Sequence, residues 1–203
     1  MFELNHPNSE NTELNPNLLS VPFDVQTNWH VITGGPSSGK TTLINLMKEK
    51  GFQTIPEVAR LYLQQEVTAG HSIAELEADL LKLQRAVVDY HLKFERGLNA
   101  SEVLFLDRAF PDCLSYNRYV GINPNEILAD CFHFHYASVF ILDRLPFQPD
   151  GIRYEDEEIA EFLHQWILKD YIALGYEVVK VPITSTEERL AFILKRLSDQ
   201  GLI

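Results

Sequence analysis

Cysteine is scarce in this chain, which has Cys113 and Cys131 as its two cysteines among 203 residues. Two cysteines cannot build a disulfide framework, and their spacing matches no zinc-site pattern. Such usage is typical of a reducing compartment. The sequence also lacks an apolar run of transmembrane length and an N-terminal signal that is first basic and then apolar. We therefore expect a cytoplasmic protein without membrane insertion.

Basic residues are few: 17 Lys and Arg stand against 29 Asp and Glu, which gives a formal net charge of −12. A surface this acidic repels nucleic acid and anionic lipid, so neither is an expected partner. A ligand that carries phosphate would have to be attracted by a local basic pocket. Hydrophobic residues make up an ordinary 45%, and the length suits one domain with a real core.

The most informative segment is glycine-rich and runs from Gly34 to Thr41. It matches the pattern G-x-x-x-x-G-K-[ST] at every fixed position. Residues 29–33 before it are predicted to form a buried strand, and residues 42–50 after it a helix. A strand, a glycine-rich turn and a helix in this order are the structural context in which the pattern holds the phosphates of a nucleotide.

Each part of this loop has a chemical role. Gly34 and Gly39 allow backbone angles that a Cβ would forbid, so that successive amides can form a nest for an anion. The N-terminus of the following helix adds to the positive field. Lys40 is placed for the β- and γ-phosphates, Thr41 for Mg²⁺, and Thr42 for the α-phosphate. The predicted nucleotide-binding residues of the loop are Gly34, Gly35, Pro36, Ser37, Ser38, Gly39, Lys40, Thr41 and Thr42. The predicted cofactors are ATP or GTP and Mg²⁺.

Apolar strands alternate with helices along the rest of the chain. Strands are predicted at 29–33, 51–55, 102–107, 137–143 and 176–181, and helices at 57–69, 72–94, 155–174 and 186–197. This alternation predicts an α/β fold with a parallel sheet covered on both faces, which binds ligands at the carboxyl ends of its strands. Residues 1–28, rich in asparagine, are expected to be a partly extended N-terminal extension, and residues 29–203 the nucleotide-binding domain.

Three side chains outside the loop are predicted to act beside it. Asp107 ends an apolar strand, where a carboxylate can hold Mg²⁺ together with Thr41. Arg108 follows and is a candidate to neutralise a phosphoryl group. Glu57, at the start of a helix, either accepts a proton from an attacking hydroxyl or is simply an acid favoured by the helix dipole.

A proline- and glycine-containing segment at 143–153 is predicted to be a loop over the cleft that excludes water during reaction. Its Arg144 and Arg153 are candidates to stabilise charge on the transferred group, although a purely structural loop is the alternative. The nucleotide base is expected near residues 182–186, with Arg189 close by. An acceptor pocket is expected from Tyr62, Gln84, Asp89 and Tyr90.

An ordered series of motifs resembles a known family. Residues 33–42, 56–60, 105–108 with Asp112, 150–153 and 174–179 are similar to the predicted AAA-type ATPases grouped with the nicotinamide riboside kinase domain of NadR. The resemblance implies a three-layer P-loop kinase-like fold with a central parallel five-stranded sheet. It further implies that Glu57 is base or substrate ligand, that Asp107 and Arg108 lie near Mg²⁺ and phosphate, and that Arg153 acts from the lid.

These features favour a kinase that transfers the γ-phosphate of ATP to a small, nucleoside-like metabolite bearing a hydroxyl group. A nucleotide-dependent regulatory switch and a plain NTPase without an acceptor are the alternatives. All three need the same phosphate site, so the motifs leave open the choice among them and between adenine and guanine.

Overall fold

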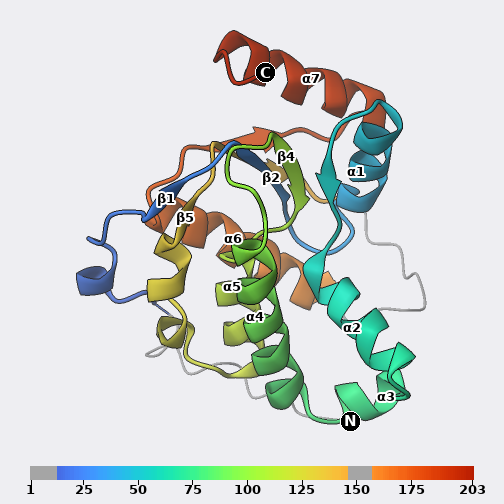
Figure 1. The fold of residues 1–203 in the computed structure, drawn as a ribbon, viewed down its shortest axis with the longest axis vertical. Coiled ribbons are helices and arrows are strands. Elements are labelled where there is room, and N and C mark those ends of the chain that lie inside the picture. The colour runs from blue at the N-terminus through green and yellow to red at the C-terminus, as the bar shows by residue number, and fades with distance from the viewer. Residues whose placement is uncertain (1–12, 146–156) are drawn as a thin grey trace.

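The computed structural model describes residues 13–145 and 157–203. Its centre is a sheet of 5 parallel strands in the order β3-β4-β2-β6-β7 (Figure 1). The strands are β2 (Trp29–Thr33), β3 (Thr54–Ile55), β4 (Leu104–Asp107), β6 (Ser138–Leu142) and β7 (Val178–Val181). The predicted α/β fold with five parallel strands is confirmed. β2 and β4 are buried along their whole length, which explains why most of their residues are apolar.

Alternate residues of the central strand enter two separate cores. Val31 belongs to a core that also takes in residues of α4, α5 and α6, whereas Ile32 belongs to a core shared with α1 and α7. This alternation follows from the two-residue period of a strand and produces three layers: helices, sheet and helices. The helices are α1 (Lys40–Glu49), α2 (Val58–Thr68), α3 (Ile73–Glu77), α4 (Leu80–Arg96), α5 (Asp112–Val120), α6 (Glu157–Ala173) and α7 (Thr186–Asp199).

The prediction of one long helix from Ser72 onward is wrong in one respect: this segment forms two helices, α3 and α4. Ser72 and Glu75 form a capping box that starts α3. Asp79 then accepts a hydrogen bond from the amide of Lys82 and starts α4. An aspartate that caps amides competes with helix continuation, which accounts for the break.

The residues before β2 pack on the domain from Glu13 onward. Leu14 is buried, and the ring of Phe23 contacts those of Phe132 and Tyr176. β1 (Val25–Gln26) pairs in parallel with β5 (Phe134–His135). Short 3₁₀ helices lie at Pro16–Leu18, Pro124–Glu126 and Ala129–Phe132. Within the described ranges, no helix is both long and apolar enough to cross a membrane.

Candidate functional site

The glycine-rich loop joins the carboxyl end of β2 to the N-terminus of α1. Gly34 has a φ of 138° and Gly39 a φ of 83°, and the intervening Ser37 also has a positive φ, of 60°. A Cβ on Gly34 would lie 2.8 Å from the carbonyl oxygen of Leu142 in β6. The glycines at both ends are therefore required by geometry. Gly39 also precedes α1 without offering a side-chain cap to its first amides.

Four carbonyl groups of the loop are held by hydrogen-bond donors. Three of the donors are cationic side chains from different elements, and the fourth is a backbone amide after β6. The pairs are Arg108 Nη1 to Gly34 O (3.0 Å), Lys40 Nζ to Gly35 O (2.9 Å), Leu145 N to Ser37 O (3.2 Å) and Arg189 Nη1 to Ser38 O (2.6 Å). Because these carbonyls are engaged, the loop keeps a fixed curvature with cations around it, the arrangement that suits an anion.

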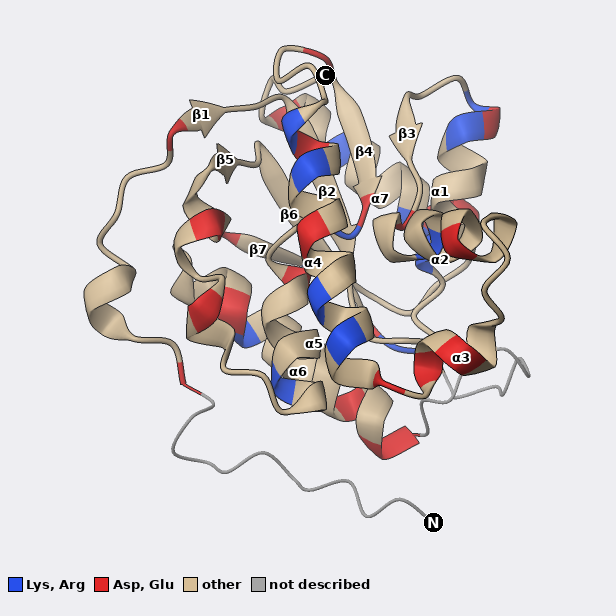
Figure 2. Cartoon of the chain, turned by 60° about the horizontal axis from the view of Figure 1, so that its bottom comes forward, with Lys and Arg blue, Asp and Glu red and all other residues tan. Residues whose placement is uncertain are grey.

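Positive charge is concentrated here in a chain that is acidic overall. Figure 2 shows acidic residues spread over several helices, with red segments on α3 and at the start of α6. In contrast, Lys40, Arg108 and Arg189 are 5%, 6% and 3% exposed, and the side chain of Arg144 is 8% exposed. These buried cations surround the loop and supply positive charge near the place where an anionic ligand would bind.

Thr41 and Asp107 meet at the start of α1. Thr41 Oγ1 donates to Asp107 Oδ2 over 3.2 Å. Asp107 Oδ1 is buried and, among the described residues, has no hydrogen-bond partner. Burial raises the pKa of Asp107, and Lys40 opposes this effect. A hydroxyl and an unsatisfied carboxylate oxygen are donors that fit a hard cation such as Mg²⁺.

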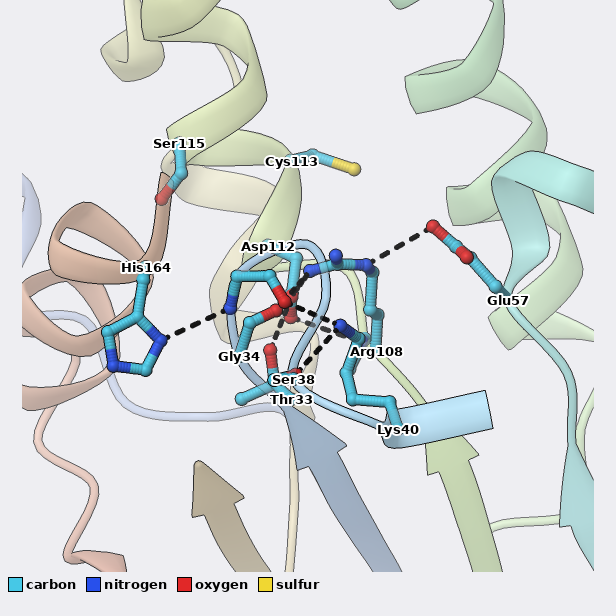
Figure 3. Close-up of polar contacts among 12 residues, drawn as sticks. Thr33, Gly34, Ser38, Lys40, Glu57, Arg108, Asp112, Cys113, Ser115 and His164 are labelled. Carbon is cyan, nitrogen blue, oxygen red and sulfur yellow. Dashed lines mark hydrogen bonds and ion pairs between the residues drawn. The ribbon is translucent and has the colours of Figure 1, made fainter. Parts of the chain in front are cut away.

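Arg108 and Glu57 face each other beside the loop (Figure 3). Arg108 has a φ of 68°, and its Nε lies 3.2 Å from Glu57 Oε1. Glu57 Oε2 accepts a second bond from Arg60 Nε, over 2.9 Å. Burial alone would raise the pKa of Glu57, but Arg108, Lys40 and Arg60 outweigh it and lower the pKa to about 2. Glu57 is therefore an anion at neutral pH, held in place by cations.

The position of Arg108 depends on Asp112, for which the sequence predicted no role of its own. Asp112 is 2% exposed, and its Oδ1 accepts bonds from Arg108 Nη1 (2.9 Å) and from Thr33 Oγ1 (2.5 Å). Its Oδ2 accepts the Tyr171 hydroxyl over 2.8 Å. Asp112 thus joins β2, α5 and α6 beneath the loop. The i, i+4 spacing from Arg108 was the available signal for this pairing.

His164 of α6 also contacts the loop and was missed by the sequence reasoning. Its Nδ1 accepts the amide of Gly35 over 3.2 Å, shown as a dashed line in Figure 3. Burial lowers the pKa of His164, which keeps the ring neutral and able to accept. No motif marks this histidine, since its contact depends on how closely α6 approaches Gly35: a Cβ there would lie 2.7 Å from Ala160 O.

A cavity of about 320 Å³ lies next to Glu57 and Arg108, between α2, α3, α4 and α5. Of the four residues expected in an acceptor pocket, Gln84 lines it, and Tyr62, Asp89 and Tyr90 do not. Tyr62 and Tyr90 instead pack on each other, with ring centroids 5.5 Å apart. The apolar lining comes from Val58, Leu63, Ile73, Leu83 and Val87.

The remaining predicted arginines have distinct positions. Arg144 pairs with Glu161 of α6 at 2.8 Å and with Glu157 at 3.0 Å, at the edge of the loop. Arg189 of α7 lies behind the loop, where it also donates to the carbonyl groups of Asp143 and Pro182. Arg153 lies outside the described residues.

Comparisons with known proteins agree with this architecture. A solved deoxyadenosine kinase from M. mycoides with dCMP and dCDP bound aligns with a TM-score of 0.57 and 16% identity, covering 84% of this chain and 98% of that one. The thymidylate kinase of Candida albicans aligns with a TM-score of 0.56 and 14% identity, over 87% and 93% of the two chains. The structure of NadR in complex with NR gives a TM-score of 0.60 and 18% identity, over 85% of this chain and 51% of NadR.

At these identities the structural matches establish the fold. No curated protein sequence matches the chain significantly. A family model described as an AAA domain, AAA_28, matches residues 29–189. This match begins at β2, includes the glycine-rich loop, Glu57 and the Asp107 to Asp112 segment, and extends to Arg189. The chain belongs to the AAA_28 family of AAA domains, and it has the P-loop kinase-like fold.

Proposed function

We propose that this protein is a kinase that transfers the γ-phosphate of ATP or GTP to a hydroxyl group of a small, nucleoside-like molecule. One observation carries the proposal. Glu57 and Arg108 lie between the glycine-rich loop and the cavity of about 320 Å³, and both line that cavity. A donor phosphate on the loop and an acceptor in the cavity would therefore meet at these two side chains.

The loop would hold the triphosphate. Residues 34–42 supply backbone amides and the start of α1, and Lys40 is close enough to exchange its bonds to Gly35 O and Ser38 Oγ for phosphate oxygens. Thr41 and Asp107 would hold Mg²⁺, which supplies charge neutralisation between the β- and γ-phosphates. Arg108 and Arg144 would stabilise the charge on the phosphoryl group during transfer. Arg153 is assigned the same task from its sequence position alone.

Glu57 would orient the acceptor hydroxyl. Because its pKa is lowered to about 2, Glu57 is a weak base toward a free alcohol. It can accept the proton late, once bonding to phosphorus has made the hydroxyl acidic, which suits the loose transition state of phosphoryl transfer. Positioning by Glu57 and charge stabilisation by Arg108 would then supply most of the rate enhancement.

The nature of the acceptor is inferred from the cavity and from the similar structures. A nucleoside combines an apolar base with hydroxyl groups, and the cavity combines apolar side chains with Gln84 and Glu57. The solved structures that share the fold include a deoxyadenosine kinase and a thymidylate kinase. Both observations favour a nucleoside-like acceptor over a protein or a sugar polymer.

The test is a transfer assay with ATP or GTP and a panel of nucleosides, read by mass spectrometry. One acceptor should gain a phosphoryl group, and Glu57→Gln should lose that product while still binding nucleotide. Glu49→Gln, at the exposed end of α1, is the matched control and should retain activity. Slow hydrolysis without any acceptor, together with nucleotide-dependent binding of a protein or lipid, would instead favour the regulatory switch.

A further inference from the structure

Two side chains that line the cavity, Cys113 and His91, form a buried row with Glu95, and the proposed phosphoryl transfer does not use this row. Cys113 Sγ lies 3.7 Å from His91 Nδ1, and His91 Nε2 lies 3.0 Å from Glu95 Oε1. Cys113, His91 and Glu95 are 5%, 4% and 1% exposed. Cys113 and His91 both line the cavity, and in Figure 3 the sulfur points to the side on which Glu57 lies.

The carboxylate of Glu95 is fixed by more than the histidine. Its Oε1 also accepts the amide of Phe110 over 2.9 Å, and its Oε2 accepts the Tyr136 hydroxyl over 2.8 Å. With these bonds Glu95 anchors one nitrogen of His91 and directs the other at the sulfur. Burial alone would lower the pKa of His91, but its hydrogen bonds to Cys113 and Glu95 outweigh this effect and raise the pKa to about 10.

A nucleophile, a base in contact with it and a carboxylate that orients the base form the arrangement that activates cysteine in many unrelated proteins. Cys113 is also the second residue of α5, where the helix dipole favours negative charge. We propose that Cys113, with His91 as proton carrier, is a covalent modification site for small, largely apolar α,β-unsaturated carbonyl compounds that enter the cavity.

The proposed step balances without an additional reagent. The sulfur of Cys113 attacks the β-carbon of the ligand and forms a C–S bond, while the electron pair of the C=C bond moves to give the enolate. The thiol proton is already on His91 when the sulfur attacks, because the raised pKa of His91 favours the protonated ring, and His91 then gives this proton to the α-carbon. Nothing leaves and nothing is oxidised. Val58, Leu63 and Val87 give the cavity an apolar surface on which the carbon skeleton of such a ligand can pack.

The chain provides its own control in Cys131. This thiol is 2% exposed and donates to the carbonyl group of Ile127 over 3.7 Å. Burial raises the pKa of Cys131 well above its usual range, and nearby negative groups add to the effect. Cys131 does not line the cavity. It should therefore be inert in the folded protein.

The experiment treats the full chain with N-ethylmaleimide and follows both cysteines by peptide mass spectrometry. In the folded protein, Cys113 should react at least about tenfold faster than Cys131, because reactivity follows thiolate character and access. In concentrated urea the two rates should converge. Equal rates in the folded protein, or a faster Cys131, would overturn the proposal.

A second measurement tests the proton carrier. His91→Gln should slow the reaction of Cys113 about tenfold and leave that of Cys131 unchanged. If the variant failed to fold, Cys113 and Cys131 would both react at the rates measured in urea. The ratio of the two rates in the unaltered protein would then still test the modification site. An unchanged Cys113 rate in folded His91→Gln would refute the role of His91.

This modification site depends on the cavity and not on the proposed kinase activity. If a nucleoside acceptor occupies the cavity, it should protect Cys113 from N-ethylmaleimide. Selective reaction of Cys113 without protection by any nucleoside would contradict the acceptor assignment, while the covalent site would stand.

Discussion

Arg108 Nη1 and Asp112 Oδ1 lie 2.9 Å apart, with both side chains almost completely buried. The same nitrogen donates to Gly34 O, so that one guanidinium joins the glycine-rich loop to α5. Asp112 lines the cavity, and its bond to Arg108 also determines where Arg108 lies relative to Glu57. The charge of Asp112 is thus a positioning element for the proposed site.

Asp112→Asn should destabilise the protein by about 1.5–3 kcal/mol, because it removes the charge of one of the two carboxylates that pair with the buried Arg108 and leaves Glu57 as the other. The free energy of unfolding from urea titration measures this change. Tyr171→Phe removes only one hydroxyl from the same carboxylate and should cost about 1 kcal/mol. Equal effects of the two substitutions would show that the charge of Asp112 is not the important feature.

Lys40→Ala should reduce nucleotide affinity at least about 100-fold, because charged hydrogen bonds contribute about 1.5–3 kcal/mol each. Calorimetric titration with ATP and GTP measures the loss, and circular dichroism should show an unchanged fold. Lys48→Ala, on the exposed side of the same helix, is the control and should bind normally. Unchanged affinity in Lys40→Ala would remove the basis for the phosphate site.

Gly35→Ala should weaken nucleotide binding and cost about 1–3 kcal/mol of stability, as overpacking does. The new Cβ would lie 2.7 Å from Ala160 O and 2.8 Å from His164 Cβ, which forces α6 away from the loop. Gly175→Ala is the control: it is strained by a φ of 90° but has open space around it, so it should reduce stability without altering affinity. Thermal unfolding with and without nucleotide separates the two effects.

His30 should make the protein less stable in mild acid. Its Nε2 is buried without a hydrogen-bond partner among the described residues, and burial lowers its pKa from 6.5 to about 4. Between these values the unfolded chain binds a proton that the folded chain does not. Stability is therefore complete above pH 6.5 and falls by about 3 kcal/mol as the pH drops to about 4.

Urea titrations across this pH range check the His30 prediction. His30→Leu should flatten the profile, whereas Ser138→Ala, which removes the hydroxyl near Nδ1 but leaves the burial, should retain it. The same slope in His30→Leu and the unaltered chain would assign the acid sensitivity to other groups.

The periodicity of apolar residues, together with the glycine, proline and capping residues at the ends of elements, predicted the sheet and most helices. Burial determines this periodicity in strands and in helices alike. β2 and β4 are buried throughout and mostly apolar, and a short segment of this composition is typical of a strand in a parallel sheet covered on both faces. The helix α5 was not predicted, because its buried face includes Asp112, Ser115, Asn117 and Arg118 and so lacks an apolar stripe. Polar burial of this sort requires partners that are distant in sequence.

The candidate site was predictable where the residues of one short segment determine its conformation by themselves. The loop at 34–41 is such a segment, and the proximity of Thr41 and Asp107 follows from the parallel sheet, which brings strand ends to one edge. The contact of His164 was not predictable, because it depends on how closely α6 approaches the loop. The row from Cys113 to Glu95 was not predictable either, because it depends on how α4 and α5 pack together. Their roles, like those of Glu57 and Arg144, remain predictions for the experiments above.

The three carbonyl groups that Arg189 joins belong to Ser38, Asp143 and Pro182, which come from segments far apart in the chain. Because a single guanidinium ties them together, the loop cannot shift without moving the ends of β6 and β7 as well. The loss of conformational entropy that orders this loop therefore occurs during folding, before any ligand binds. An incoming anion would meet a receptor already in shape, and its binding free energy would go into contacts rather than into rearrangement.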